Sequence, residues 1–240
     1  SLTKHDATSL KSIWDNIRPP RPDGEDGEDG EDGAVVVSAH ENAFVDLIDA
    51  IPKSVDRIVV VDNASTDNTS KIAEKRGAEV VTEKRKGYGY ACLKGLEHLA
   101  KNSPDIVVFL DGDYSDYAED LDEIVSPIIL KEVVFCIGAR DKKLREKGSL
   151  TYQQIFGNKL ACFLMKWLYQ SKFSDLGPFR AIRWQSLQEL KMEDKTYGWT
   201  IEMQLKVLRK KMSYKEIPVR YRKRLGVSKV SGTIKGTLLA

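Results

Sequence analysis

Short apolar runs along this chain alternate with longer segments in which apolar residues recur every three or four positions. The apolar runs, which are typical of buried strands, lie at 34–38, 57–61, 79–81, 106–110 and 133–138. The segments with helical spacing lie between them, at 41–51, 69–76, 90–100 and 120–130. Strands that alternate with helices in this way predict an α/β fold: a Rossmann-like, mostly parallel sheet flanked by helices, with right-handed crossovers.

The regular alternation ends after residue 140. The pattern then predicts a helix at 152–170, a strand at 179–183, a helix at 200–210 and a last strand at 213–219. The apolar side of the first helix consists of Tyr152, Ile155, Phe156, Leu160, Phe163, Leu164, Trp167 and Leu168. We expect this side to pack into the core rather than to anchor the protein to a membrane. One domain is therefore predicted over 34–240, with a nucleotide-binding half at 34–140 and an irregular, acceptor-side half at 141–240.

Residues 1–33 differ in composition from the rest of the chain. Pro19, Pro20 and Pro22 precede a tandem Gly-Glu-Asp repeat that ends at Gly33. Such a segment carries too little apolar surface to fold by itself. We expect a flexible acidic tail or linker, or a segment that is not native to the protein, and assign no chemistry to it.

Composition narrows the classes of protein. Lys and Arg (38) nearly balance Asp and Glu (36), and the net charge of +2 argues against a nucleic-acid binder. The three cysteines, Cys92, Cys136 and Cys162, are scattered in apolar contexts, as expected for reduced thiols in a cytoplasmic protein. No signal peptide or membrane-spanning run is visible. The basic stretch near the C-terminal end nevertheless allows peripheral contact with the inner face of a membrane.

The strongest chemical signal is the run at 105–113. The apolar residues at 106–110 suit a buried strand, which ends in Asp111 and Asp113. Open α/β sheets bind ligands at the carboxyl ends of their strands. Two carboxylates this close repel each other unless a cation or hydrogen-bond donors offset their charge. Mg²⁺ or Mn²⁺, held by these carboxylates and by substrate phosphates, meets that need; the alternative is an ordinary turn rich in Asp and Gly.

Two other nucleotide-binding classes fit the chain poorly. Asp62 ends the second predicted strand, where a dinucleotide-binding fold places an acid that holds a ribose. That fold also needs a glycine-rich turn after its first strand, and residues 38–42 contain no glycine. The glycines at 87 and 89 follow the wrong strand. An NAD(P)-dependent dehydrogenase and a sugar-nucleotide-forming nucleotidyltransferase are therefore disfavoured.

Several ordered motifs carry a resemblance to a known family. They are Val-Val-Asp62-Asn-Ala-Ser-Thr-Asp67, Lys86-Gly-Tyr-Gly, Leu-Asp111-Gly-Asp113, Gly138-Ala-Arg140, Ser174-Asp-Leu-Gly-Pro-Phe-Arg180, Trp199-Thr-Ile-Glu-Met203 and Arg224-Leu-Gly-Val-Ser-Lys-Val-Ser-Gly232. Over residues 34–240 the chain resembles family 2 glycosyltransferases with the GT-A fold, in the branch related to polyprenyl-phosphate (dolichol-phosphate) sugar transferases. The resemblance implies a UDP- or GDP-sugar donor, a divalent metal and inversion at the anomeric carbon. A polyprenyl phosphate is the first choice of acceptor.

One segment departs from the pattern of the family. Its members usually show a Pro followed shortly by Asn-Glu after the first strand, where the base of the nucleotide is held. This chain instead has Ser38-Ala-His40-Glu41-Asn42, which is shorter and reverses the order of the acid and the amide. A sugar-nucleotide-binding protein without turnover is therefore kept as the alternative.

The resemblance implies roles for the matching residues on the donor side. Asp62, with Asn63, would hold the base, and Glu41 would lie near the ribose. Asp113 would ligate the metal that bridges the diphosphate, and Asp111 would contact the ribose or the metal. Phosphate contacts are expected from Lys86, Arg224 and Lys229. The alternatives are a turn residue for Asp62, an exposed helix acid for Glu41 and a solvated lysine for Lys86.

On the acceptor side, the expected chemistry depends on the acceptor. A hydroxyl needs a general base, for which Glu202 and Asp175 are the candidates. The alternative for Glu202 is an ordinary surface glutamate. A lipid phosphate is already an anion and needs cations instead, which the C-terminal stretch offers as Arg220, Arg222, Lys223, Arg224 and Lys229.

Overall fold

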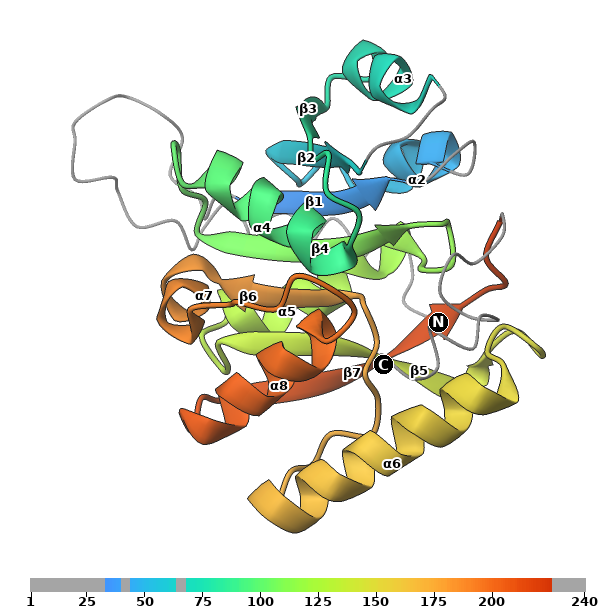
Figure 1. The fold of residues 1–240 in the computed structure, drawn as a ribbon, viewed down its shortest axis with the longest axis vertical. Helices are drawn as coiled ribbons and strands as arrows, with labels where there is room; N and C mark the ends of the chain where they lie inside the picture. The colour runs from blue at the N-terminus through green and yellow to red at the C-terminus, as the bar shows by residue number, and fades with distance from the viewer. Residues whose placement is uncertain (1–32, 40–43, 64–67, 226–240) are drawn as a thin grey trace.

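The computed structural model describes residues 33–39, 44–63 and 68–225. Within them, seven strands form one mixed sheet in the order β3-β2-β1-β4-β6-β5-β7 (Figure 1). The strands are β1 (Gly33–Ala39), β2 (Arg57–Asp62), β3 (Glu79–Thr82), β4 (Ile106–Gly112), β5 (Phe135–Arg145), β6 (Arg180–Arg183) and β7 (Tyr214–Tyr221). Only β6 runs antiparallel to its neighbours, β4 and β5. The predicted, mostly parallel sheet is confirmed.

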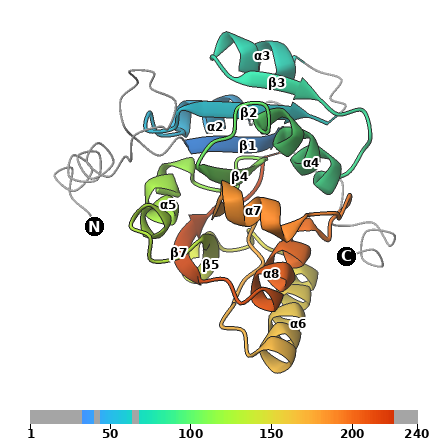
Figure 2. The same ribbon diagram turned by 90° about the vertical axis from the view of Figure 1, so that its left-hand side faces the viewer.

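Helices cover both faces of the sheet (Figure 2). One core cluster joins the sheet to α2 (Phe44–Ala50), α3 (Thr69–Lys75) and α5 (Leu121–Ile129), which follows the short 3-10 helix η1 (Ala118–Asp120). The other joins it to α4 (Tyr88–Leu99), α6 (Tyr152–Tyr169), α7 (Trp184–Leu190) and α8 (Trp199–Arg209). Along β1, Val35 and Val37 enter the first cluster, whereas Ala34 and Val36 enter the second. A strand that is buried on both faces consists of consecutive apolar residues. For this reason the apolar run at 34–38 predicted β1 correctly.

The expectation that the apolar side of the helix at 152–170 packs into the core is wrong. The helix itself is present as α6, but Phe156, Phe163 and Trp167 are 70%, 63% and 73% exposed. Only a narrow side that includes Cys162 and Met165 is buried. The physical reason is position: α6 lies at the margin of the molecule, where it packs on α8.

The remaining elements differ from the prediction in two places. The short helix α7 was not predicted, and β5 continues to Arg145 because its ladder with β7 extends as far as Tyr221. Cys92, Cys136 and Cys162 are all buried and free. Among the described residues, no helix has both the length and the apolar composition needed to cross a membrane.

Candidate active site

The carboxyl ends of β1, β2 and β4 meet at one edge of the sheet. The strand register places Ala39 of β1 beside Asp62 of β2 and, on its other side, beside Gly112 of β4. Asp62 and Asp111 therefore flank β1 at the same edge. This is the place where open α/β sheets bind ligands.

Asp113 lies just beyond the end of β4 and contacts the end of the described chain. Its Oδ1 accepts hydrogen bonds from the backbone N–H and the hydroxyl of Ser115, at 3.0 and 2.5 Å. Its Oδ2 forms an ion pair with Nη2 of Arg224 at 2.6 Å. Tyr114, with a φ of 61°, makes the turn that follows. The structure thus brings together a predicted metal ligand and a predicted phosphate contact.

Asp111 has an oxygen without a protein partner. Its Oδ1 is buried and accepts no hydrogen bond from the described residues. Burial, followed by the charge of Asp113, raises the pKa of Asp111 to about 7. The position therefore favours a bound cation, which would relieve the repulsion between the two carboxylates.

Asp116 is a third carboxylate that the sequence interpretation missed. It is fully buried, and neither of its carboxylate oxygens has a hydrogen-bond partner among the described residues. Burial, together with the charges of Asp111 and Asp113, raises its pKa well above the ordinary value. A signal was present, because Asp116 ends the polar run that begins at Asp111. Its own burial, however, could not be read from that run.

Arginines of β7 and of the residues after it hold the loop that contains these carboxylates. Nε of Arg222 donates to the carbonyl of Tyr114 at 2.6 Å, and its guanidinium lies 3.4 Å from the centroid of the Tyr114 ring. Arg220 forms an ion pair with Asp120. Arg220 and Arg222, two of the predicted cations for a lipid phosphate, thus contact the protein itself. The side chain of Lys223 is exposed.

Asp62 and Asn63 are buried at the end of β2. Oδ2 of Asp62 accepts a hydrogen bond from the hydroxyl of Ser70 at 2.6 Å. The Asn63 amide donates to the carbonyls of Glu83 and Arg85, at 3.1 and 2.6 Å, and accepts from the N–H of Gly87 at 3.1 Å. Asn63 therefore organises the loop that carries Lys86, whose side chain is exposed.

The glycines at 87 and 89 serve close packing at the start of α4. The N–H of Gly89 donates to the carbonyl of Thr196 at 2.9 Å, and that of Tyr90 to the carbonyl of Lys195 at 3.1 Å. A Cβ on Gly89 would lie 2.1 Å from the carbonyl oxygen of Asp194. The first N–H groups of α4 thus bind the chain itself rather than a phosphate.

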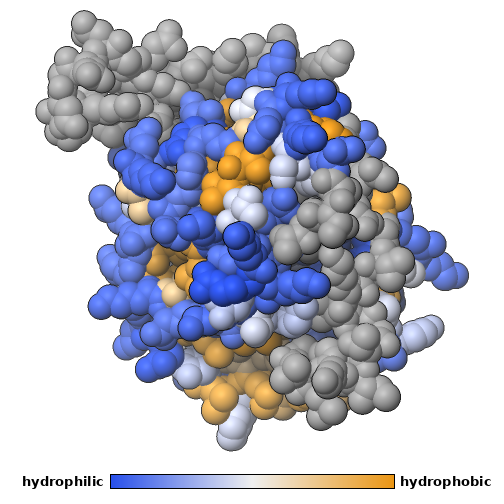
Figure 3. Space-filling model, turned by 45° about the horizontal axis from the view of Figure 1, so that its top comes forward, coloured by the Kyte–Doolittle hydropathy of each residue, from blue (hydrophilic) through white to orange (hydrophobic). Residues whose placement is uncertain are grey.

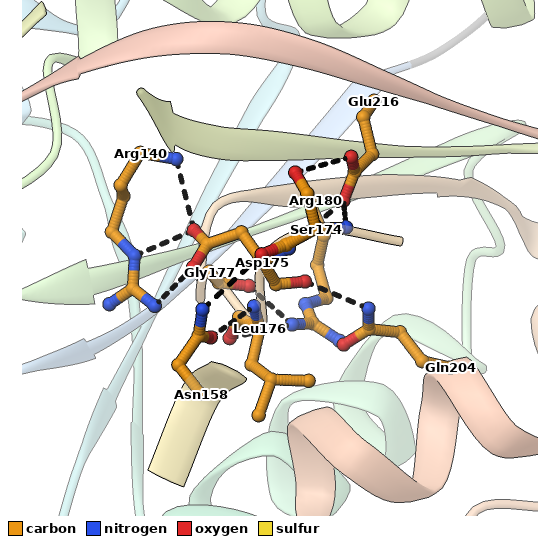
Figure 4. A network of polar contacts seen from close by, with 9 residues as sticks. All are labelled: Arg140, Asn158, Ser174, Asp175, Leu176, Gly177, Arg180, Gln204 and Glu216. Carbon is orange, nitrogen blue, oxygen red and sulfur yellow. Dashed lines mark hydrogen bonds and ion pairs between the residues drawn. The ribbon is translucent and has the colours of Figure 1, made fainter. Parts of the chain in front are cut away.

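Asp175 belongs to a polar network that holds the segment before β6 (Figure 4). Its carboxylate accepts from Nε and Nη2 of Arg140, at 2.7 and 2.8 Å, and from the Arg140 N–H at 2.9 Å. Arg180 is fully buried and donates to the backbone carbonyls of Gly177 and Thr200. Burial lowers the pKa of Arg180 to about 10. Further contacts to the same segment come from Asn158, Gln204 and Glu216.

Glu202 lies in the first turn of α8. Its oxygens accept from the N–H groups of Glu193 and Asp194, at 2.9 and 2.8 Å, and one of them pairs with Lys206 at 2.7 Å. Glu202 also lines a groove of about 360 Å³ between α8 and Tyr169. The structure therefore places Glu202 in contact with the 193–194 loop. The remaining predicted site residues, Glu41 and Lys229, lie outside the described residues, as does the altered segment at 40–42.

Comparison with known proteins decides the family. The model of the family described as "Glycosyl transferase family 2" matches residues 39–191. The chain belongs to glycosyl transferase family 2. An uncharacterized glycosyltransferase of Mycobacterium tuberculosis is 32% identical over 205 residues, covering 83% of this chain and 89% of the relative. An undecaprenyl-phosphate mannosyltransferase of Micrococcus luteus is 27% identical over 213 residues, covering 79% and 81%.

Solved structures agree on the fold of this family 2 glycosyltransferase. The glucosyl-3-phosphoglycerate synthase of M. tuberculosis, crystallised with Mn²⁺, UDP and phosphoglyceric acid, superposes with a TM-score of 0.64. The two chains are 21% identical, and the match covers 83% of this chain and 72% of that one. The predicted family, the GT-A fold and the class of enzyme, a nucleotide-sugar-dependent glycosyltransferase, are confirmed.

The acidic residues of this glycosyltransferase fit a metal that is shared with a substrate. The described residues hold no group of three or more His, Cys, Asp and Glu side chains placed to bind a metal ion. Asp111 and Asp113 supply two carboxylates, and Oδ1 of Asp111 has no hydrogen-bond partner among the described residues. Mg²⁺ and Mn²⁺ are commonly bound by one or two carboxylates and complete their shell with phosphate oxygens and water. The residues present therefore fit a cation that is bound together with a diphosphate.

Proposed function

We propose that this family 2 glycosyltransferase transfers a hexose from a UDP- or GDP-sugar to a polyprenyl phosphate, with inversion at the anomeric carbon. The observation that carries the proposal is the contact between Arg224 and Asp113, next to Asp111. It puts a guanidinium for phosphate beside two carboxylates for a divalent cation. The relative from M. luteus, named for an undecaprenyl-phosphate acceptor, supports the choice of acceptor.

On the donor side, each residue has one task. Asp62, at the edge of the sheet, accepts hydrogen bonds from the base, and Asn63 holds the loop that brings Lys86 toward the phosphates. Asp111 and Asp113 would hold Mg²⁺ or Mn²⁺, which would supply positive charge for the leaving nucleoside diphosphate. Arg224 then contacts a phosphate of the donor or of the acceptor. A fold relative crystallised with Mn²⁺ and UDP supports the choice of a divalent metal and a nucleotide as ligands.

On the acceptor side, a phosphate is favoured over a hydroxyl. A phosphate oxygen is already an anion and attacks without a general base, whereas a hydroxyl must lose a proton. The oxygens of Asp175 and Glu202 already accept hydrogen bonds from the protein. Although burial acts in the opposite direction, the hydrogen bonds and charge of Arg140 lower the pKa of Asp175, which makes it a weaker base. The role of either residue as a general base stays a prediction.

A lipid acceptor also sets the location of the reaction. The polyprenyl chain lies in a bilayer, so the enzyme would act at the inner face of a membrane while its nucleotide-sugar donor comes from the cytoplasm. This peripheral contact is part of the proposal.

The decisive measurement is thermal stability with a panel of UDP- and GDP-sugars, each with and without Mn²⁺. A donor at 100 times its Kd should stabilise the fold by roughly 2.7 kcal/mol. One nucleotide should shift the melting temperature, only with Mn²⁺, and Asp113→Ala should abolish the shift. Glu123→Ala, which removes an exposed carboxylate on α5, is the matched control and should leave it intact.

Two outcomes would contradict the proposal. A shift that does not need metal would refute the site at Asp111 and Asp113, and no shift with any donor would refute donor binding altogether. Slow release of UDP or GDP from the bound donor separates an enzyme from a protein that binds without turnover, because only a competent site hydrolyses it.

A further inference from the structure

Helix α6 has two apolar sides, and only one of them is covered. Its inner side, which includes Cys162 and Met165, packs on the second core cluster. Its outer side is exposed and consists of Tyr152, Phe156, Leu160, Phe163, Leu164, Trp167 and Leu168. From Phe156 onward these residues recur every three or four positions, so they form one continuous stripe. A contiguous apolar patch of this kind marks an interaction surface.

Most of the view in Figure 3 is hydrophilic; apolar side chains form a broad patch at its lower end and smaller groups higher up. This is the end of the molecule where α6 lies in Figure 1. The stripe is therefore a local feature and does not reflect a generally apolar surface.

The charges within α6 and in the segment that leads to it are almost all positive. The helix contains Lys159 and Lys166 and no acidic residue. Between residues 142 and 172 the only acidic residue is Glu146, and the basic ones are Lys142, Lys143, Arg145, Lys147, Lys159, Lys166 and Lys172. Part of the charge of Glu146 is offset by the backbone N–H of Lys223, which donates to its carboxylate at 3.0 Å. An apolar stripe with basic borders is complementary to an anionic lipid surface.

We infer that the outer side of α6 docks on an anionic lipid bilayer, with the helix lying in the plane of the headgroups. Aromatic and leucine side chains enter the boundary of the acyl chains, and the lysines contact lipid phosphates. The helix lies on the membrane and does not cross it, since no described helix is able to span a bilayer. A second copy of this chain is a poorer occupant, because a symmetric contact would bring the basic borders of two stripes together.

The inference rests on the proposed function, because docking would serve a lipid acceptor. The structure connects the outer side of α6 with the proposed site at Asp113. The N–H of Glu146 donates to the carbonyl of Tyr221 at 2.8 Å, and the chain continues from there to Arg224 and its ion pair with Asp113. In the other direction, Glu146 lies five residues before Thr151, the N-cap of α6. A lipid phosphate would thus reach Asp113 and Arg224 while its hydrocarbon chain stays in the membrane beside α6.

The test is co-sedimentation of the full chain with vesicles of phosphatidylcholine, with and without phosphatidylglycerol. The wild type should bind the anionic vesicles, and binding should weaken as salt rises. Phe163→Glu with Trp167→Glu should reduce the partition coefficient by at least about tenfold, because charges replace buried aromatic area. Leu130→Glu changes an exposed leucine at the end of α5 and should bind like the wild type. Lys159→Glu with Lys166→Glu should reduce binding to the anionic vesicles.

The inference is overturned if the wild type does not bind anionic vesicles, or if the Phe163 and Trp167 variant binds as well as the wild type. It is also overturned if sedimentation equilibrium shows that the wild type is a dimer and the Phe163 and Trp167 variant a monomer, while adding vesicles does not change the dimer. The donor-induced thermal shift is measured on the same proteins. A variant that keeps the shift is folded and loses only docking. A wild type that binds vesicles but shows no donor shift refutes the proposed function and leaves the docking surface standing.

Discussion

At the scale of single residues, the partner that folding brings to each acid decides its behaviour. Asp113 and Asp175 both form an ion pair with an arginine. Arg224 contacts one oxygen of Asp113, at the edge of the sheet, whereas Arg140 contacts both oxygens of Asp175. Asp116 meets no hydrogen-bond donor among the described residues, although it lies close in sequence to Asp113. The sequence showed that acids gather at 111–116, and only the structure shows which partner each acid meets.

Asp175→Asn should lower the free energy of unfolding by about 3 kcal/mol at pH 7, because it leaves Arg140 buried without its counter-ion. Despite the opposing effect of burial, Arg140 lowers the pKa of Asp175 in the folded state. Such a carboxylate stabilises the fold above its unfolded pKa, and the contribution is lost as the pH falls through the folded pKa. The difference from the wild type should therefore shrink below about pH 4. Urea titrations over a pH series measure it.

Glu123→Gln serves as the control and should change stability by less than about 0.5 kcal/mol. If Asp175→Asn unfolds like the wild type but transfers sugar to a hydroxyl acceptor orders of magnitude more slowly, Asp175 is a general base. The assignment to a structural network would then be wrong.

At the scale of elements, periodicity located the helices and strands but not every surface that they contact. The run at 106–110 became β4, and the segment at 90–100 became most of α4. The pattern did not show that α4 starts at Tyr88 and is covered there by residues 194–196. For α6 the pattern was correct about the helix and wrong about burial, because periodicity reports an apolar face and not what covers it.

Gly89→Ala should destabilise the protein by roughly 1 to 3 kcal/mol, because the new Cβ would lie 2.1 Å from the backbone oxygen of Asp194. Gly157→Ala on α6 is the matched control, since a Cβ there meets no atom within 4 Å. It should stabilise by up to about 1 kcal/mol through helix propensity. Thermal and urea unfolding compare the two. Equal effects of both variants would show that the contact between α4 and the 194–196 loop does not matter.

At the scale of the whole molecule, the proposed site at Asp111 and Asp113 joins parts of the chain that are far apart. The family match ends at residue 191, yet Arg224, beyond it, contacts Asp113 within it. The part of the chain beyond the family match therefore supplies a contact to the predicted metal ligand Asp113.

The Arg224→Ala variant should bind free Mn²⁺ more tightly than the wild type does. At saturating Mn²⁺ it should bind the donor more weakly. In the wild type the guanidinium occupies Oδ2 of Asp113 and competes with a cation, but once a donor is bound it is free to contact phosphate. Changes of about tenfold in each direction are expected for a charge-assisted hydrogen bond. Calorimetric titration with Mn²⁺, and then with donor at saturating Mn²⁺, measures both.

Lys223→Ala removes an exposed neighbouring charge and should leave both affinities within about twofold. If Arg224→Ala also leaves both unchanged, the contact with Asp113 has no role in ligand binding, and the proposed function loses the observation that carries it.

The sequence by itself determined the alternating α/β order, the family and the strand end that presents Asp111 and Asp113. These features follow from local periodicity and from motifs within a few residues of one another. Only the tertiary structure decided that Arg224 meets Asp113, that Arg140 holds Asp175, and that the apolar stripe of α6 faces outward. Each of these depends on which distant segment packs beside a residue, and the pattern of a single segment carries no information about its distant neighbours.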